Sequence, residues 1–163
     1  MLPGKTIFLN GTSSAGKTTL AHALQEHMPE PWLHIALDQY RDSMPARFRG
    51  LNAPEGTDGH RGLNVVPVVH AGQTVTEVRF GDMGRQMLQG MRRAIRALVL
   101  EGNNAIIDDI ILMPEFLDDY LDAMTGLPVY FVGVMCPKVV VSAREASRPG
   151  RFPGTAIGHF DVC

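Results

Sequence analysis

Four short runs of apolar residues predict the buried strands of this chain. They cover residues 6–10, 32–37, 104–108 and 129–135. Runs that are apolar throughout, in place of strands that alternate apolar and polar residues, are typical of a parallel sheet covered on both faces. Segments with a helical period separate the runs, so the pattern predicts an α/β domain with a parallel sheet and helices on both faces.

The segments between the predicted strands carry apolar residues at helical spacing. Helices are expected over residues 18–27, over residues 82–100, and from Pro114 onward. The 82–100 helix should bury a stripe made of Met83, Met87, Met91, Ile95, Leu98 and Val99. The third helix should turn inward Phe116, Leu117, Tyr120, Leu121 and Met124. The arginines of the 82–100 helix are expected on its surface, where basic residues are usually solvated: Arg85, Arg92, Arg93 and Arg96.

A glycine-rich loop, Gly-Thr-Ser-Ser-Ala-Gly-Lys-Thr at residues 11–18, joins the first strand to the first helix. Its terminal glycines let the backbone bring N–H groups close to phosphate oxygens, and the helix dipole favours an anion there. Lys17 is expected to reach the β- and γ-phosphates, and the Thr18 hydroxyl to ligate Mg²⁺. The loop predicts binding of a nucleoside triphosphate, expected to be ATP although GTP stays open. The predicted binding residues are Gly11, Thr12, Ser13, Ser14, Ala15, Gly16, Lys17, Thr18 and Thr19.

The composition fits a single globular domain spanning residues 1–163. The formal net charge is −2, so neither nucleic acid nor membrane is expected as a partner. Cys136 and Cys163 show neither metal-site spacing nor a disulfide framework. Because a transmembrane run and a secretion signal are also absent, we expect a cytoplasmic protein. The oligomeric state stays open.

Residues 44–80 interrupt the alternation of strands and helices. Within them, residues 65–69 and 74–78 are predicted to pair as a hairpin, with Pro67 at an edge or a bulge. An excursion after the second strand of a phosphate-loop protein commonly builds the acceptor side of the pocket. We therefore expect these residues to shape the site of the second substrate.

Aspartates follow the predicted strands at the edge where ligands of an open α/β sheet bind. Asp38 follows the second strand and could accept the proton of an alcohol that attacks the γ-phosphorus, or it could cap the next helix. Asp108 ends the third strand and is predicted to orient Mg²⁺ or its waters together with Thr18. Asp109 could face the acceptor or cap a turn.

Three arginines near the end of the chain, Arg144, Arg148 and Arg151, recur at positions i, i+4 and i+7. Arg144 and Arg148 would share a helix face, and the Pro-Gly pair after Arg148 would turn the chain so that Arg151 folds over. This spacing predicts a mobile arginine lid over residues 144–154 that closes on the triphosphate and stabilises transition-state charge. A solvated basic helix end is the alternative.

Missing motifs disfavour other classes of phosphate-loop protein. The sequence has no Asn-Lys-x-Asp motif for guanine recognition, and no Asp-x-x-Gly switch follows Asp109. No glutamate ends a core strand as the water-activating base of motor-type ATPases would. The remaining pattern favours a small-molecule kinase whose catalytic residues are Lys17, Asp38, Arg144, Arg148 and Arg151.

The order of several motifs resembles the chloramphenicol phosphotransferase family. These motifs are residues 7–17 (Ile-Phe-Leu-Asn-Gly-Thr-Ser-Ser-Ala-Gly-Lys), 28–33 (Met-Pro-Glu-Pro-Trp-Leu), Asp38 with 42–45 (Asp-Ser-Met-Pro), 106–110 (Ile-Ile-Asp-Asp-Ile), 130–134 with Cys136, and 144–151. The resemblance implies a P-loop kinase fold like that of nucleoside-monophosphate kinases. It also implies transfer of the γ-phosphate of ATP to a primary hydroxyl of an amphipathic small molecule, with Asp38 as the general base. Inactivation of an antibiotic would be one outcome of such a reaction.

The sequence departs from the family pattern in two places, one that bears on the acceptor and one that bears on the length of the chain. Residues 47–80 share little with the family beyond length, so the acceptor need not be chloramphenicol. The family continues past the lid into another strand and a final helix, which this sequence is expected to lack, and one sheet edge would then be open. A kinase of a sugar or of a nucleotide-linked sugar, as in zeta-type toxins, and a non-catalytic ATP-dependent switch stay as alternatives.

Overall fold

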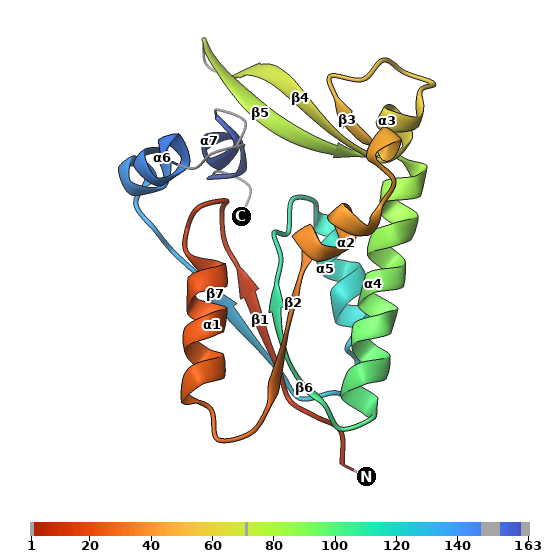
Figure 1. Cartoon of the computed structure of the whole chain (residues 1–163), viewed down its shortest axis with the longest axis vertical. Coiled ribbons are helices and arrows are strands. Elements are labelled where there is room, and N and C mark those ends of the chain that lie inside the picture. Colours follow the sequence, from red (N-terminus) through yellow and green to blue (C-terminus); the bar gives the residue numbers. More distant parts are fainter. Residues whose placement is uncertain (1, 71, 148–153, 161–163) are drawn as a thin grey trace.

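A parallel sheet forms the body of the molecule in this computed structural model, which describes residues 2–70, 72–147 and 154–160 (Figure 1). The strand order is β2-β6-β1-β7, and every strand pair is parallel. The bounds are Thr6–Asn10 for β1, Trp32–Ala36 for β2, Asn104–Asp108 for β6 and Val129–Gly133 for β7. This arrangement confirms the predicted α/β class with a parallel central sheet.

Helices cover both faces of this sheet. Helix α1 (Lys17–His27) lies on one face, and α4 (Asp82–Leu100) and α5 (Pro114–Ala123) lie on the other (Figure 1). Successive residues of β1 therefore serve different clusters, because Phe8 packs with α4 and α5 whereas Leu9 packs with α1. A strand buried on both faces needs apolar residues at consecutive positions, which explains the unbroken runs in the sequence.

A second sheet stands beyond the carboxyl ends of the central strands. Its order is β3 (Arg49–Leu51), β4 (Leu63–His70) and β5 (Gln73–Phe80), with β4 and β5 antiparallel. The predicted hairpin is thus present and longer than expected. Pro67 pairs with Thr76 of β5, while the pairing of β3 on the other side of β4 ends at Val65. A proline is tolerated at this position because no described strand needs its missing N–H there.

Shorter elements complete the described chain. They are α2 (Leu37–Ser43), the 3₁₀ helix η1 (Ala46–Phe48), α3 (Asp58–Arg61), α6 (Lys138–Ala146) and α7 (Thr155–Phe160). Helix α7 packs against both α6 and β5, so it links the end of the described chain to the hairpin. No described helix is long and apolar enough to cross a membrane.

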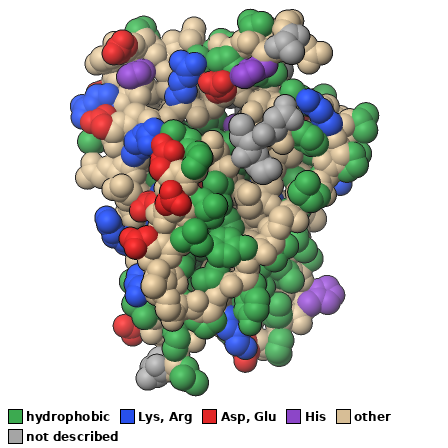
Figure 2. Space-filling view, turned by 180° about the vertical axis from the view of Figure 1, so that it is seen from behind, with side chains coloured by type: hydrophobic (Ala, Val, Ile, Leu, Met, Phe, Trp, Pro, Cys, Tyr) green, Lys and Arg blue, Asp and Glu red, His purple; other side chains and the backbone are tan. Residues whose placement is uncertain are grey.

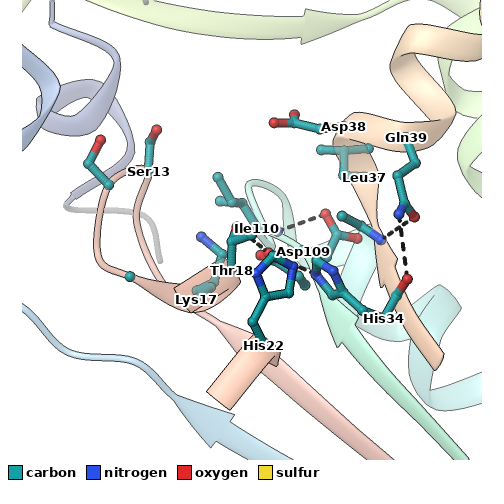
Figure 3. A pocket seen from close by; sticks show the side chains of 14 residues that line it. Ser13, Lys17, Thr18, His22, His34, Leu37, Asp38, Gln39, Asp109 and Ile110 are labelled. Atoms are coloured by element: carbon teal, nitrogen blue, oxygen red, sulfur yellow. Dashed lines mark hydrogen bonds and ion pairs between the residues drawn. The ribbon is translucent and has the colours of Figure 1, made fainter. Parts of the chain in front are cut away.

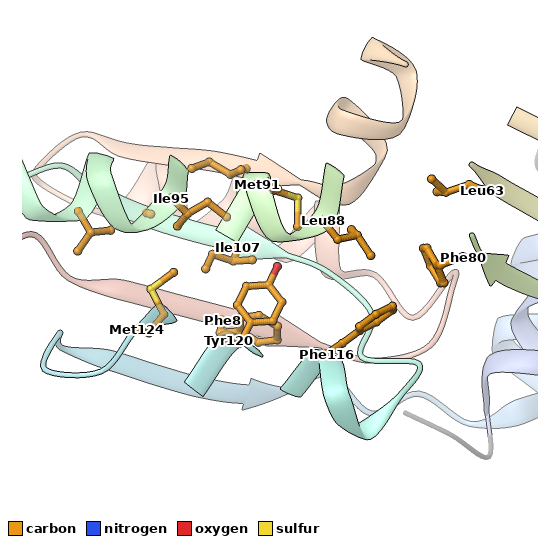
Figure 4. Packing of buried hydrophobic residues seen from close by; sticks show 13 residues of the cluster. Phe8, Leu63, Phe80, Leu88, Met91, Ile95, Ile107, Phe116, Tyr120 and Met124 are labelled. Atoms are coloured by element: carbon orange, nitrogen blue, oxygen red, sulfur yellow. The ribbon is translucent and has the colours of Figure 1, made fainter. Parts of the chain in front are cut away.

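The largest hydrophobic cluster fills the space between the central sheet and helices α4 and α5 (Figure 4). Phe8 and Tyr120 meet edge to face with ring centroids 4.6 Å apart, and Phe80 and Phe116 meet in the same way at 5.0 Å. Phe80 and Leu63 belong to the second sheet, so one continuous core holds the two sheets together. This shared core fixes the hairpin over the edge where ligands of the central sheet are expected.

Several side chains of α4 and α5 lie elsewhere than predicted. Arg92 was expected on the surface but is only 2% exposed; its guanidinium lies against the rings of Phe116 and Tyr120 and pairs with Asp119. Three leucines expected in the core are exposed, namely Leu98, Leu117 and Leu121. A helical period identifies a stripe but not the direction from which a neighbouring helix approaches. Because α5 packs beside α4, Arg92 is enclosed, and its ion pair makes the burial tolerable.

The outer strands also depart from the predicted ranges. Strand β2 ends at Ala36 because Leu37 begins α2, and β7 ends at Gly133, so Met135 lies beyond it and is exposed. Strand β7 is at the edge of the sheet and exposes Tyr130, Phe131 and Val132, so the described sheet has the open edge that was expected from the sequence, and β7 is not covered on both faces. Figure 2 shows hydrophobic side chains gathered in the middle of the face that lies behind Figure 1.

Candidate functional site

The loop between β1 and α1 adopts backbone conformations that few residues tolerate. Gly16, at the N-terminus of α1, has φ 109°, and Ser14 has φ 64°. A Cβ at Gly11 would lie 2.5 Å from the carbonyl oxygen of Val134, so a side chain there would force the backbone to move. Left-handed and strained conformations of this kind concentrate at ligand sites. The two glycines of the motif are therefore required by geometry.

Lys17 places a positive charge inside this loop. Its side chain is largely buried, and Nζ donates hydrogen bonds to the carbonyl oxygens of Gly11 at 2.7 Å and Thr12 at 3.1 Å. The Ser14 hydroxyl is buried nearby and has no hydrogen-bond partner within the described parts of the chain. A cation, an unsatisfied hydroxyl and the N-terminus of α1 together fit a phosphate group.

The two residues predicted to hold Mg²⁺ lie together. The Thr18 hydroxyl donates to Asp108 Oδ2 at 2.6 Å, and His34 Nε2 lies 3.3 Å from the same carboxylate oxygen. Mg²⁺ prefers oxygen ligands and usually takes one or two from the protein, with water and phosphate oxygens supplying the rest. The described residues contain no group of three or more His, Cys, Asp or Glu that could hold a metal by themselves. Thr18 and Asp108 could therefore hold Mg²⁺ only if oxygens of a bound phosphate and of water supplied the remaining ligands.

Asp109 lies beneath this site and is almost fully buried. Its Oδ2 accepts a 2.6 Å hydrogen bond from the Tyr120 hydroxyl, and its Oδ1 accepts one of 2.7 Å from the backbone N–H of Ile110. Burial raises the pKa of Asp109, while these two hydrogen bonds and the more distant charge of Arg92 act in the opposite direction. Asp109 lines the cavity beside the phosphate loop that is described below, but not the cavity beside the second sheet.

Asp38 lies in the first turn of α2, with its side chain about half exposed. The helix already begins at Leu37, and the side chain of Gln39 accepts the Ala36 N–H at 2.9 Å, so Asp38 is inside the helix and does not cap it. Its Oδ1 accepts a 2.6 Å hydrogen bond from Arg41 Nη1. In Figure 3 the Asp38 carboxylate points from α2 toward the phosphate loop.

Two neighbouring cavities meet at Asp38. The first, the loop cavity, has a volume of about 320 Å³ and lies between the phosphate loop and the ends of β2 and β6 (Figure 3). The second, the hairpin cavity, has a volume of about 570 Å³ and lies between α2, α7 and the second sheet. The residues that line both are Ser13, Leu37, Asp38 and Ile110. Volumes in this range suit small-molecule ligands.

The walls of the hairpin cavity differ in character. One wall is apolar and consists of Leu51, Leu63, Val65, Val78, Phe80 and Leu112. The wall formed by α2 and the start of β3 carries alternating charges from Asp38, Arg41, Asp42 and Arg49. Residues 44–80 therefore do line a cavity next to the phosphate loop, and its surface suits a molecule with an apolar body and a polar end.

Arg144 is the one arginine of the predicted lid that the structure describes. It extends from α6, and its Nη1 donates to the backbone carbonyl oxygens of Ala15 at 3.1 Å and Ser14 at 3.4 Å. Arg148 and Arg151 lie outside the described residues, as do residues 148–153 of the lid. Helix α7 also touches the loop, because the Thr12 hydroxyl donates to the carbonyl oxygen of Ala156 at 2.8 Å.

Sequence reasoning missed three side chains around the site. His34 contacts Asp108, and a polar residue inside the apolar run of β2 was a signal that could have identified it. Arg41 binds Asp38 at helical spacing i, i+3, but no pattern distinguishes it from other surface arginines. Glu145 is buried in α6 and accepts the backbone N–H groups of Gly154 and Ala156, which anchors the start of α7.

Comparisons with known proteins agree on one family. A family model described as chloramphenicol phosphotransferase-like protein matches residues 4–163. Two curated proteins from Mycobacterium tuberculosis, of strains CDC 1551 and H37Rv, are each 36% identical over 162 residues. Each alignment covers 94% of this chain and 67% of the relative, and both relatives are provisionally named O-phosphotransferases.

Solved structures with a similar fold include kinases. A sugar kinase from Janibacter sp. HTCC2649 superposes with a TM-score of 0.61 at 18% identity, over 95% of this chain and 74% of that one. The APS kinase of Mycobacterium tuberculosis gives 0.60 at 14% identity, over 90% and 71%. A gluconokinase from Sinorhizobium meliloti 1021 gives 0.54 at 18% identity, over 96% and 71%. At these identities the similarity shows the P-loop kinase fold alone.

Proposed function

The chain belongs to the chloramphenicol phosphotransferase-like family, and we propose that it is a kinase that transfers the γ-phosphate of ATP to a hydroxyl group of a small molecule. The names of its relatives and the kinase folds of its structural neighbours support phosphotransfer. One observation carries the more specific proposal. Asp38, a carboxylate, lies on the shared wall of the loop cavity and the hairpin cavity.

The loop cavity supports the nucleotide half of this proposal. Backbone N–H groups of residues 11–18 and the Lys17 ammonium would bind the β- and γ-phosphates, because a cation and a helix N-terminus already converge there. The APS kinase neighbour was solved with AMPPNP and APS. Thr18 and Asp108 would hold Mg²⁺. When bound, this ion neutralises charge on the phosphate oxygens.

The hairpin cavity supports the acceptor half. Its apolar wall would bind the body of the acceptor, and its opening toward Asp38 would direct a hydroxyl group at the phosphate loop. The family description makes chloramphenicol the first acceptor to test. If chloramphenicol is the acceptor, the reaction modifies an antibiotic.

In the proposed reaction, Asp38 accepts the proton of the acceptor hydroxyl as its oxygen attacks the γ-phosphorus. The new O–P bond forms while the bond from the γ-phosphorus to the β,γ-bridging oxygen breaks, and ADP leaves with that electron pair. Lys17 and Arg144 stabilise the charge that develops on the transferred group and the leaving group, together with Arg148 and Arg151 of the predicted lid.

The test is ATP consumption by the protein against a panel of small alcohols headed by chloramphenicol, with the product identified by mass. We expect acceptor-dependent turnover and a product heavier by one phosphoryl group. Asp38→Asn should lower kcat by roughly two to four powers of ten and leave ATP affinity nearly unchanged, because only proton transfer is removed. Asp122→Asn, which changes an exposed aspartate on α5, is the matched control and should behave like the wild type.

Two outcomes would contradict the proposal. Wild-type turnover by Asp38→Asn would show that Asp38 is not the base. ATP hydrolysis that no hydroxyl compound stimulates would favour the alternative of a nucleotide-dependent switch, since a switch does not need a carboxylate at the acceptor position.

A further inference from the structure

Arg41 connects Asp38 to the wall of the hairpin cavity. Its Nη1 donates to Asp38 Oδ1 at 2.6 Å, while Nε and Nη2 donate to the two carboxylate oxygens of Asp42 at 2.9 and 3.0 Å. The guanidinium therefore uses one nitrogen for Asp38 and a parallel pair of nitrogens for Asp42. A bidentate pair of this kind fixes the plane of the guanidinium as well as its distance from the carboxylate.

Asp42 is itself held from the second sheet. Arg49, the first residue of β3, directs Nη1 to Asp42 Oδ1 at 3.3 Å. The hydrogen bond from Arg41 lowers the pKa of Asp42, and Asp42 in turn raises the pKa of Arg41, so both stay charged across the neutral range. A continuous path of hydrogen bonds thus runs from β3 through Asp42 and Arg41 to Asp38.

An isolated ion pair on a helix surface would not by itself indicate a functional role. Exposed pairs contribute little, and the i, i+3 spacing of Asp38 and Arg41 is common on helices. Two features distinguish this pair. Arg41 is only one-third exposed because it lies in the cavity wall, and it binds Asp42 through two nitrogens while a third binds Asp38. One oxygen of the Asp38 carboxylate, which lies where the two cavities meet, is thereby bound from the wall of the hairpin cavity.

We propose that Arg41 is a positioning residue for Asp38, and that Asp42 orients Arg41 for this role. By binding Oδ1, Arg41 restrains the rotation of the carboxylate and so holds it in the orientation in which it accepts the proton of the acceptor hydroxyl. This inference rests on the proposed function, in which Asp38 accepts the hydroxyl proton. Arg41 does not contact the reacting atoms in this arrangement.

The test compares Arg41→Gln, Arg41→Lys and the control Arg47→Gln in steady-state kinetics with the acceptor found above. Arg47 is an exposed arginine that pairs with Asp58 and lines neither cavity. We expect Arg41→Gln to lower kcat about 10- to 100-fold, as for other displacements of a reacting group, with little change in the KM of the acceptor. Arg41→Lys should recover part of kcat because it restores the charge but not the planar fork. The control should match the wild type.

A second readout separates positioning from a general loss of structure. In the Asp38→Asn background, Arg41→Gln should cause no further fall in kcat, because the group that it positions is already disabled. If Arg41→Gln does not fold, Asp42→Asn keeps the inference testable. It leaves Arg41 in place, should lower kcat by a smaller factor, and should also have no effect in the Asp38→Asn background.

Several results would overturn the inference while the proposed function stands. They are an unchanged kcat in Arg41→Gln, an increase in acceptor KM alone, which would make Arg41 a binding residue, and a further fall in kcat in the Asp38→Asn background. Failure of the proposed function looks different, since Asp38→Asn itself would then be fully active.

Discussion

Replacing Tyr120 with phenylalanine removes one hydroxyl from the core and keeps the ring. Tyr120 is fully buried, and its hydroxyl donates a 2.6 Å hydrogen bond to Asp109 Oδ2. The ring packs edge to face on Phe8, and the Arg92 guanidinium lies 4.6 Å from the ring centroid; both contacts remain in the variant. The substitution therefore removes the hydrogen bond to a buried carboxyl group and the interaction of the same hydroxyl with Arg92, and it leaves the packing of the ring in place.

The size of the effect follows from that geometry. A 2.6 Å distance falls in the range of hydrogen bonds from a hydroxyl to a carboxylate, and bonds to charged groups contribute roughly 1.5–3 kcal/mol. Asp109 keeps its second hydrogen bond, from the Ile110 N–H, so the loss is confined to one oxygen. We expect Tyr120→Phe to lower the free energy of unfolding by about 2 kcal/mol. For a chain of this size, Tm would fall by roughly 4–8 °C.

Urea denaturation followed by circular dichroism measures this change. The midpoint should fall while the slope stays the same, because the surface exposed on unfolding is nearly unchanged. Tyr130→Phe is the matched control, since Tyr130 is 59% exposed on β7 and its substitution should alter the free energy of unfolding by less than about 0.5 kcal/mol. If the two variants prove equally stable, the hydroxyl does not satisfy Asp109 and the reasoning is refuted.

Three further predictions concern the loop and its surroundings. Gly11→Ala should abolish ATP binding in calorimetry and lower the urea midpoint, because its Cβ would lie 2.5 Å from a backbone oxygen; Gly90→Ala, whose Cβ meets nothing within 4 Å, should do neither. Burial raises the pKa of Asp109, so the folded state keeps the carboxyl proton above about pH 4, where the unfolded chain releases it. The contribution of Asp109 to stability therefore falls as pH rises from the pKa of the unfolded chain to the higher pKa of the folded state. Asp109→Asn should flatten this decline in urea midpoints measured across pH, and an unaltered slope would contradict the assignment. Thr18→Ala should weaken ATP binding with Mg²⁺ more than ATP binding in EDTA, and equal losses would exclude Thr18 as a ligand.

The phosphate loop and the central strands could be predicted because their signals are local. Gly11 and Gly16 are required by backbone conformation at their own positions, and the strands of a doubly covered sheet are apolar at consecutive residues. The hairpin was predictable for the same reason, although β4 and β5 extend beyond the predicted ranges. Thr18 and Asp108 could be placed together because the phosphate loop follows β1 while Asp108 ends the neighbouring strand β6, and the ends of parallel strands meet at one edge.

The errors concern residues whose surroundings come from distant parts of the chain. Nothing in the sequence distinguishes Arg92 from an arginine on an exposed helix face, and only the approach of α5 places it against the rings of Phe116 and Tyr120. An open sheet edge was expected, but that β7 forms it and exposes Phe131 depends on strand order, which no local pattern encodes.

The sequence by itself determined the phosphate loop, the α/β class and the family, since each follows from residues that act within one short segment or in a fixed order. Only the tertiary structure decided that the loop cavity and the hairpin cavity meet at Asp38, and that Arg41 and Asp42 hold this carboxylate from the side of the second sheet. The physical reason is that hydrogen bonds and cavity walls depend on the positions of side-chain atoms to within about an ångström. Those positions are set by packing between elements that are far apart along the chain.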